Sequence, residues 1–170
     1  MEARKDGSTV TLKSRMQNPV LMNRDAMQAL QAAGRAAQGH GIPAQTLELI
    51  NLRVSQINGC AVCLAMQAQA LKGAGESDER LTAAAAWREA PFFSPAERAA
   101  PALAEAATRL SDRADPVPDE VWNEAARHYD EEALGALVIA IATINAWNRI
   151  NVTTRQIAGS VPASARPHRG

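Results

Sequence analysis

The stretch from Pro43 to Gln56 repeats its apolar residues at the spacing of an α-helix, and the same spacing recurs through much of the chain. One face of this expected helix carries a continuous apolar stripe, formed by Leu47, Ile50, Val54 and Ile57. Leu49 and Leu52 lie on the other side, so the helix is expected to be covered on almost all sides. In a domain of ordinary size, such coverage favours contacts between subunits as well as a core.

Helix start signals follow one another along the chain, and no segment has the alternation of a β-strand. Asn18-Pro19 places a capping side chain before a proline at the first helical position, and Ser94-Pro95-Ala96-Glu97 is a capping box. Alanine, the strongest helix former, is frequent. The expected helices cover about 19–37, 43–56, 60–73, 77–87, 94–111, 118–128 and 130–155. We therefore predict an all-α fold, a compact domain of about six to seven helices.

Pro101 lies inside the helix expected over 94–111, beyond its first turn. A proline there removes one backbone hydrogen bond, so we expect a kink that costs roughly 3 kcal/mol if nothing compensates for it.

The length of 170 residues is typical of one domain. The helical pattern begins near residue 18 and ends near residue 158, so we expect one helical domain over 18–158. Residues 1–17 are polar and aperiodic, and we expect a flexible N-terminal arm there. The polar residues 159–170 are expected to form a disordered tail.

Charge and hydropathy exclude several classes of partner. The formal net charge is zero, so no long-range field attracts nucleic acid or an anionic membrane. No apolar run approaches the roughly 20 residues that cross a bilayer. The opening MEARKDGSTV lacks the apolar region of a secretory signal. We therefore expect a cytoplasmic protein, in a compartment where a disulfide is more often catalytic than structural.

Both cysteines of the chain, Cys60 and Cys63, lie in the segment NGCAVCLAMQ, with two residues between them. A structural zinc site would require four nitrogen or sulfur ligands. The histidines are His40, His128 and His168, and none stands at zinc-finger spacing from the cysteines. We therefore expect no metal.

Three other interpretations of the cysteine pair remain. Free cysteine is a common small core residue, so the two could simply be buried. A thioredoxin-type motif would follow a strand in a βαβ unit, and no such strand is predicted. The third interpretation is a redox dithiol at the start of a helix, where unpaired N–H groups stabilise a thiolate. One sulfur would be oxidised to a sulfenic acid and the other would condense with it.

Two polar residues are candidates to assist such a dithiol. Gln67 lies four residues after Cys63, on the same helical face. A histidine there would transfer protons near neutral pH, whereas glutamine only donates or accepts hydrogen bonds. Glu48 is the one acid in the apolar helix, where burial would bring a carboxylate towards the working range of a general base. Equally, Glu48 could face solvent or pair with Arg53.

Three runs of sequence resemble the carboxymuconolactone decarboxylase superfamily, specifically its alkylhydroperoxidase-D-like branch. They are ELINLRVSQINGCAVCLAMQ, the following LKGAGESDERLTAAAAWREAPFFSPAERAA, and IATINAWNRINV near the C-terminus. The resemblance covers about residues 16–158. It implies an all-helical fold and a homo-oligomer, commonly a trimer or hexamer. It also implies reduction of a small-molecule peroxide by the dithiol without metal, flavin or other cofactor, and recycling by a dithiol or lipoyl-protein reductant.

The resemblance also implies roles for individual residues. Cys63 would attack the peroxide, Cys60 would resolve the intermediate, and Glu48 would belong to the proton relay. The family's histidine position is occupied by Gln67, and the histidine that the best-studied branch has between the cysteines is replaced by Val62. Since general acid–base help is typically worth about 10²–10⁴-fold, we expect slow turnover.

Two alternative functions belong to the same superfamily. A non-catalytic or redox-sensing member would switch between dithiol and disulfide without efficient peroxide turnover, and Gln67 favours it. Lactone decarboxylation does not depend on a C-x-x-C pair, so the dithiol argues against it. The C-terminal Asn145, Trp147, Asn148 and Arg149 are expected to serve packing and subunit contacts.

Overall fold

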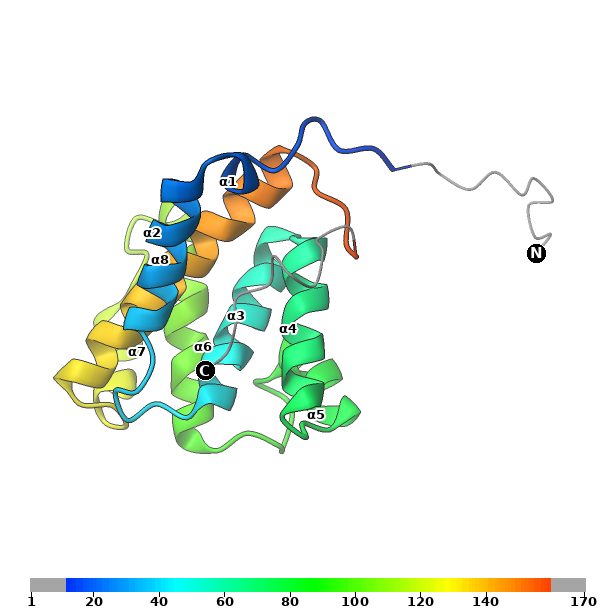
Figure 1. Ribbon diagram of the computed structural model, residues 1–170. Coiled ribbons are helices and arrows are strands. Elements are labelled where there is room, and N and C mark those ends of the chain that lie inside the picture. Colours follow the sequence, from blue (N-terminus) through cyan, green and yellow to red (C-terminus); the bar gives the residue numbers. More distant parts are fainter. Residues whose placement is uncertain (1–11, 160–170) are drawn as a thin grey trace.

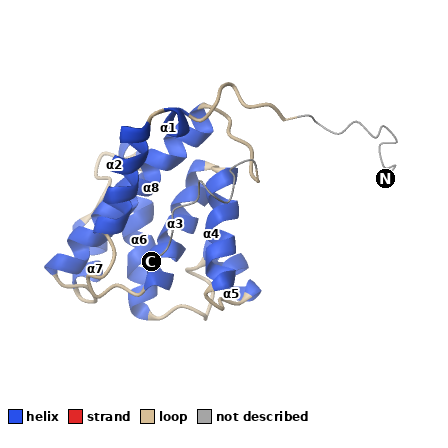
Figure 2. Cartoon of the chain, viewed as in Figure 1, coloured by secondary structure: helices blue, strands red, loops and turns tan. Residues whose placement is uncertain are grey.

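A computed structural model describes residues 12–159 of the chain, and in that part every regular element is a helix (Figures 1 and 2). The all-α prediction is therefore confirmed. The elements are α1 (Pro19–Met22), α2 (Arg24–Ala36), α3 (Ala44–Asn58), α4 (Ala61–Gly73), α5 (Asp78–Ala83), α6 (Pro95–Thr108), α7 (Asp119–Ala126) and α8 (Glu131–Thr153), with short 3₁₀ turns at Ala84–Ala86 and Leu110–Asp112.

Side-chain caps start most of these helices as the sequence indicates. Ser94 and Glu97 form both hydrogen bonds of the capping box at α6, and Asp130 caps α8. The single helix expected over 19–37 is wrong, because it is divided into α1 and α2. Asn23 is extended at the break, and its side chain accepts the N–H of Ala26, so the chain starts a new helix there.

Helix α6 also ends earlier than expected. It remains helical through Pro101, which is fully buried, and stops at Thr108 rather than near residue 111. The 3₁₀ turn at Leu110–Asp112 occupies the remainder of the expected helix.

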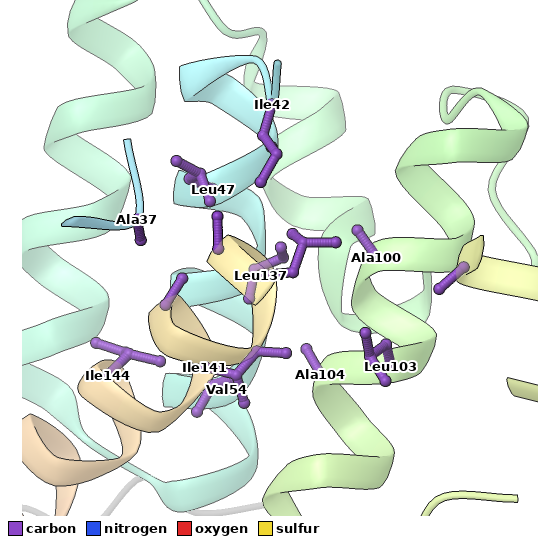
Figure 3. Packing of buried hydrophobic residues seen from close by; sticks show 14 of the residues in the cluster. Ala37, Ile42, Leu47, Val54, Ala100, Leu103, Ala104, Leu137, Ile141 and Ile144 are labelled. Atoms are coloured by element: carbon purple, nitrogen blue, oxygen red, sulfur yellow. The ribbon is translucent and has the colours of Figure 1, made fainter. Parts of the chain in front are cut away.

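Helix α3 lies at the centre of the molecule and packs against α4, α6 and α8 (Figure 1). On one side, Ile50 and Val54 join α6 and α8 in the main core, where Leu137 and Ile141 of α8 lie towards Leu103 of α6 in Figure 3. Ile144 belongs to the same core. On the other side, Leu49 and Leu52 join a second cluster with Leu71, Trp87 and Phe93. The expected coverage of α3 is thus supplied by the chain's own helices.

The expectation that no apolar run is long enough to cross a bilayer is wrong for α8. By length and composition alone, Glu131–Thr153 is sufficiently long and apolar. In the fold, half of the apolar stretch is buried against other helices, and α8 packs on α2, α3 and α6. Three of its buried residues, Asn145, Asn148 and Asn151, are polar. These features are those of a core helix.

The segment before α1 contacts the end of α8. The backbone N–H of Arg15 donates to the carbonyl of Thr154 over 2.9 Å, and the Gln156 side chain donates to the carbonyl of Met16 over 3.0 Å. The flexible arm expected over 1–17 lies outside the described residues up to residue 11. The disordered tail expected over 159–170 lies outside them from residue 160 onwards.

Candidate redox site

The two cysteines form a disulfide at the first turn of α4, with their Cα atoms 5.3 Å apart. Gly59 ends α3 in the left-handed conformation, at φ 67°, and lets the chain reverse direction. Cys60 is then the N-cap of α4, and its Sγ accepts the backbone N–H of Cys63 over 3.3 Å. The sequence therefore predicted correctly that both sulfurs lie at a helix start within bonding reach.

Both sulfurs lie inside the protein, beside a small pocket. Cys60 is 1% exposed and Cys63 is 3% exposed. The pocket has a volume of about 300 Å³ and lies between the α3–α4 turn and the end of α8. Cys60 and Asn151 are among its lining residues, whereas Cys63 lies behind them. A small molecule in this pocket would therefore meet Cys60 and Asn151 first.

Asn151 of α8 supplies a hydrogen bond to the second sulfur, and the sequence analysis missed this residue. Its side-chain amide donates to Cys63 Sγ over 3.4 Å. Its Oδ1 accepts from the Asn18 side chain over 2.9 Å, and Asn18 in turn accepts the N–H of Val20. Because Oδ1 is occupied by Asn18, the NH₂ group of Asn151 must face the sulfur.

Two further asparagines continue this polar row along α8. Asn148 is fully buried and donates to Ser55 Oγ, and Asn145 donates to Thr108 Oγ1. Asn58, the last residue of α3, donates to the Oδ1 of both. They therefore pack within the chain, as expected, and they also fix α3 to α8 beside the cysteines. Three asparagines spaced by three residues on an apolar helix were the signal for this row, since buried polar groups are rarely without a partner.

Glu48 and Gln67, the two residues expected to assist the dithiol, lie on the two helices that meet at the α3–α4 turn. Glu48 is half-buried on α3, seven residues before Ser55, whose carbonyl accepts the N–H of Cys60. At 1.5 Å per residue, Glu48 lies about 10 Å along the α3 axis from Ser55. Gln67 is half-buried one turn beyond Cys63, about 6 Å along α4. The backbone N–H of Cys63 donates to Cys60 Sγ, and the Asn151 side chain donates to Cys63 Sγ.

Arg53, the candidate partner of Glu48, binds a different carboxylate. Its Nε is 2.6 Å from Glu105 Oε1, which also accepts from Trp87 Nε1 over 2.9 Å. Arg88 donates to the second oxygen over 2.6 Å. Burial alone would raise the pKa of Glu105, but the hydrogen bonds from Trp87, Arg88 and Arg53 outweigh it and hold the pKa below its usual range. This cluster ties α3 to α6 and to the segment after α5.

A larger pocket, of about 460 Å³, lies away from the cysteines at the other end of α3. Thr46, Arg80, Glu97 and Tyr129 are among its lining residues. The Tyr129 hydroxyl donates to the carbonyl of Ala96, and burial together with nearby Glu97 raises its pKa to about 12. A hydroxyl held in its protonated form to such a pH is poorly suited to act as a base, so we place no chemistry there.

The histidines of the described residues lie away from the dithiol. His40 pairs with Glu132, and His128 with Glu124. Within residues 12–159, no three side chains of the His, Cys, Asp and Glu types gather in a way that would hold a metal ion.

Comparisons with known proteins agree with this geometry. The model of the carboxymuconolactone decarboxylase family matches residues 24–106. The uncharacterised protein YdfG of Bacillus subtilis is 43% identical over 115 residues, which are 68% of this chain and 77% of YdfG. The uncharacterised protein YnjA of Escherichia coli is 32% identical over 103 residues, 61% of this chain and 55% of YnjA, so this chain spans just over half of that relative.

Solved structures show the same fold. A protein of unknown function from Agrobacterium tumefaciens, proposed to be the antioxidant defence protein AhpD, superposes with a TM-score of 0.80 at 30% identity, over 88% of this chain and all of that one. The debrominase Bmp8 superposes with a TM-score of 0.73 at 24% identity, over 86% of this chain and 77% of its own, a likeness of fold alone.

Proposed function

Because the chain belongs to the carboxymuconolactone decarboxylase family, in its alkylhydroperoxidase-D-like branch, we propose that it reduces organic hydroperoxides through Cys60 and Cys63 in antioxidant defence. The observation that carries the proposal is the pair of sulfurs bonded at the first turn of α4, beside a pocket.

In the oxidative half of the cycle, the hydroperoxide passes Cys60 and Asn151, which line the pocket, and reaches Cys63. The thiolate of Cys63, the attacking cysteine by resemblance, then attacks the outer oxygen of the hydroperoxide. The O–O bond breaks, the alkoxide takes up a proton and leaves as an alcohol, and Cys63 becomes a sulfenic acid. Cys60 then attacks that sulfur, and water is released as the disulfide forms. Asn151 lines the pocket and donates to Cys63 Sγ, so it can stabilise the thiolate while a peroxide occupies the pocket.

Proton transfer is the weak point of this site. Asn151 stabilises negative charge but cannot accept a proton at neutral pH, and neither can Gln67. Glu48, half-buried on α3, is the remaining candidate for the proton relay, as the resemblance implies. We therefore propose a slow peroxidase, with substrates that are small enough for a pocket of about 300 Å³.

A second candidate function is redox sensing, in which the pair switches between dithiol and disulfide without efficient turnover. Gln67 favours it, because a glutamine at the position of the family's histidine cannot transfer a proton. The two functions differ in rate. Peroxide consumption sustained by a dithiol reductant supports the enzyme, whereas a single oxidation per chain supports the sensor.

One experiment tests the proposal directly. The reduced protein is mixed with cumene hydroperoxide, and mass spectrometry follows the loss of two hydrogen atoms from the peptide that contains both cysteines. Cys63→Ser should abolish peroxide consumption, and Cys60→Ser should stop the cycle after one turnover. Peroxide consumption that is unchanged in Cys63→Ser would reject the assignment.

We also propose that the protein works in the cytoplasm as a homo-oligomer. Val138 and Ile139 of α8 are 43% and 42% exposed in the single chain, and a second subunit packed on this side of α8 would bury them. The mass of the particle in solution, measured by light scattering, tests the oligomer.

A further inference from the structure

The pocket beside Cys60 contains a positive charge that forms no ion pair within residues 12–159. Arg155 is the charged residue that lines it within the described part of the chain, and its side chain is exposed. No acidic side chain among residues 12–159 forms an ion pair with Arg155. The charge is therefore available to a molecule in the pocket.

Arg155 also occupies a backbone position that ordinarily selects glycine. Its φ is 52°, and it is the one residue other than glycine with a positive φ in residues 12–159. It follows the C-cap Thr154, with its N–H bonded to Val152 O and the N–H of Gln156 bonded to Asn151 O, the pattern of a Schellman motif. A side chain is disfavoured in this conformation, so an arginine here requires another reason.

Capping of α8 does not supply that reason. The carbonyl of Thr153 accepts from the guanidinium of Arg15 over 2.7 Å, and that of Thr154 accepts from the Arg15 N–H. The carbonyls of Asn151 and Val152 are bonded within the Schellman motif. The last carbonyls of the helix thus already have donors, and the side chain of Arg155 is not needed for them.

We propose that Arg155 binds the carboxylate of a small anionic thiol, which enters this pocket and reduces the Cys60–Cys63 disulfide. The inference rests on the dithiol cycle proposed above. A volume of about 300 Å³ fits a small molecule, and Ala61 and Val152 offer apolar contact for its carbon chain. The attacking thiolate is itself negative, so the same guanidinium attracts both charges of the reductant.

The reaction follows from which sulfur lines the pocket. The thiolate attacks Cys60 Sγ, the bond to Cys63 breaks, and Cys63 leaves as a thiolate that accepts the hydrogen bond of Asn151. A second thiol of the reductant then attacks the mixed disulfide and releases Cys60. Two thiols of the reductant are oxidised to one disulfide, and the protein disulfide gains those two electrons and, from the two thiols, two protons.

Dihydrolipoate and dihydrolipoamide provide a matched pair of probes. Both are dithiols with the same carbon chain, but dihydrolipoate ends in a carboxylate and dihydrolipoamide ends in a neutral amide. The oxidised protein is mixed with each, in the absence of oxygen and peroxide, and free thiols are alkylated and counted by mass spectrometry. We expect dihydrolipoate to react roughly fivefold faster at low salt, as for a solvent-exposed ion pair. In 1 M salt the ratio should fall towards one.

Arg155→Gly removes the charge and suits the backbone, so this variant should melt no lower than the parent while its rate ratio falls to about one. Arg113→Gly is the control, since Arg113 is an exposed loop arginine and should keep the fivefold ratio. The proposal would be overturned if the parent protein reacted with dihydrolipoate and dihydrolipoamide at equal rates. It would also be overturned if Arg155→Gly kept the fivefold preference for dihydrolipoate, or if Arg113→Gly lost it.

The same assay separates this inference from the peroxidase. If peroxide is consumed with dihydrolipoamide but the dithiols react equally, the anion site is wrong and the enzyme stands. If the protein reacts faster with dihydrolipoate but consumes no peroxide, the anion site stands and the proposed peroxidase function is wrong.

Discussion

The side-chain amide of Asn151 donates to Cys63 Sγ over 3.4 Å, although 88 residues separate the two in sequence. The orientation of that amide is set by Asn18, which occupies its oxygen. A hydrogen bond to sulfur strengthens when the sulfur becomes a thiolate, because donors bind charged acceptors more strongly than neutral ones. Asn151 is therefore placed to favour the reactive form of Cys63.

Replacing Asn151 by alanine should lower the thiolate fraction of Cys63 at neutral pH. A hydrogen bond to a charged group is worth about 1.5–3 kcal/mol, so the midpoint of the pH dependence of Cys63 alkylation should rise by about one unit or more. The measurement uses reduced Cys60→Ser protein with iodoacetamide across a pH series. Asn148→Ala is the matched control, since Asn148 is buried on the same helix but bonds Ser55. An equal shift in both variants would contradict a direct role of Asn151.

Asn18→Ala should give a smaller shift in the same direction, because Asn18 acts on the sulfur through Asn151. In the double variant with Asn151→Ala, removing Asn18 should have no further effect on Cys63 alkylation. Additive shifts would mean that the two asparagines act independently.

Gln67→His should raise the rate of peroxide consumption by up to about 10²-fold, because it adds a proton-transfer group one turn beyond Cys63. The rate should then acquire a pH dependence near the titration of histidine, which the parent lacks. Gln69→His is the control, since residue 69 is exposed on the same helix. No gain from Gln67→His would favour the redox-sensing function.

Glu105 should make the protein sensitive to acid. Its folded pKa lies below the ordinary value of 4.5, so its contribution to stability is fully present above that pH and is lost as the pH falls through the folded value. Urea unfolding should therefore give a lower free energy below about pH 4 in the parent. Glu105→Gln should lose about 2 kcal/mol at pH 7, the worth of a hydrogen bond to a charged group, and show a weaker pH dependence. Glu120→Gln, an exposed carboxylate of α7, should leave both unchanged.

The local signals of the sequence predicted the helices well, and the reason is physical. Caps such as Ser94 and turns such as Asn58-Gly59 act on neighbouring residues, so they can be read without the fold. The placement of Cys60 and Cys63 was predictable for the same reason. Asn23 was missed as a break because its cap competes with a continuous helical pattern on both sides.

The remainder of the site depends on contacts between distant segments. Asn151 meets Cys63 only after α8 has packed on α3, and Asn18 joins from the other end of the chain. The role of Glu48 in the proton relay rests on the resemblance alone, and it stays a prediction. The spacing of residues within one helix shows on which face and at which turn each residue lies. It does not show which residue of another helix will contact it.

Arg15 and Asn18 bind the last turns of α8, and Asn151 of α8 binds Cys63. These contacts between distant parts of the chain have a consequence for biosynthesis. A ribosome releases Cys60 and Cys63 long before Asn151, so during translation both thiols leave the exit tunnel without the amide that orients one of them. In that interval the nascent chain presents two unshielded thiols to any oxidant. Disulfide pairing within a three-residue separation keeps such an early oxidation harmless, because the bond formed on the ribosome is the same bond that the finished protein contains.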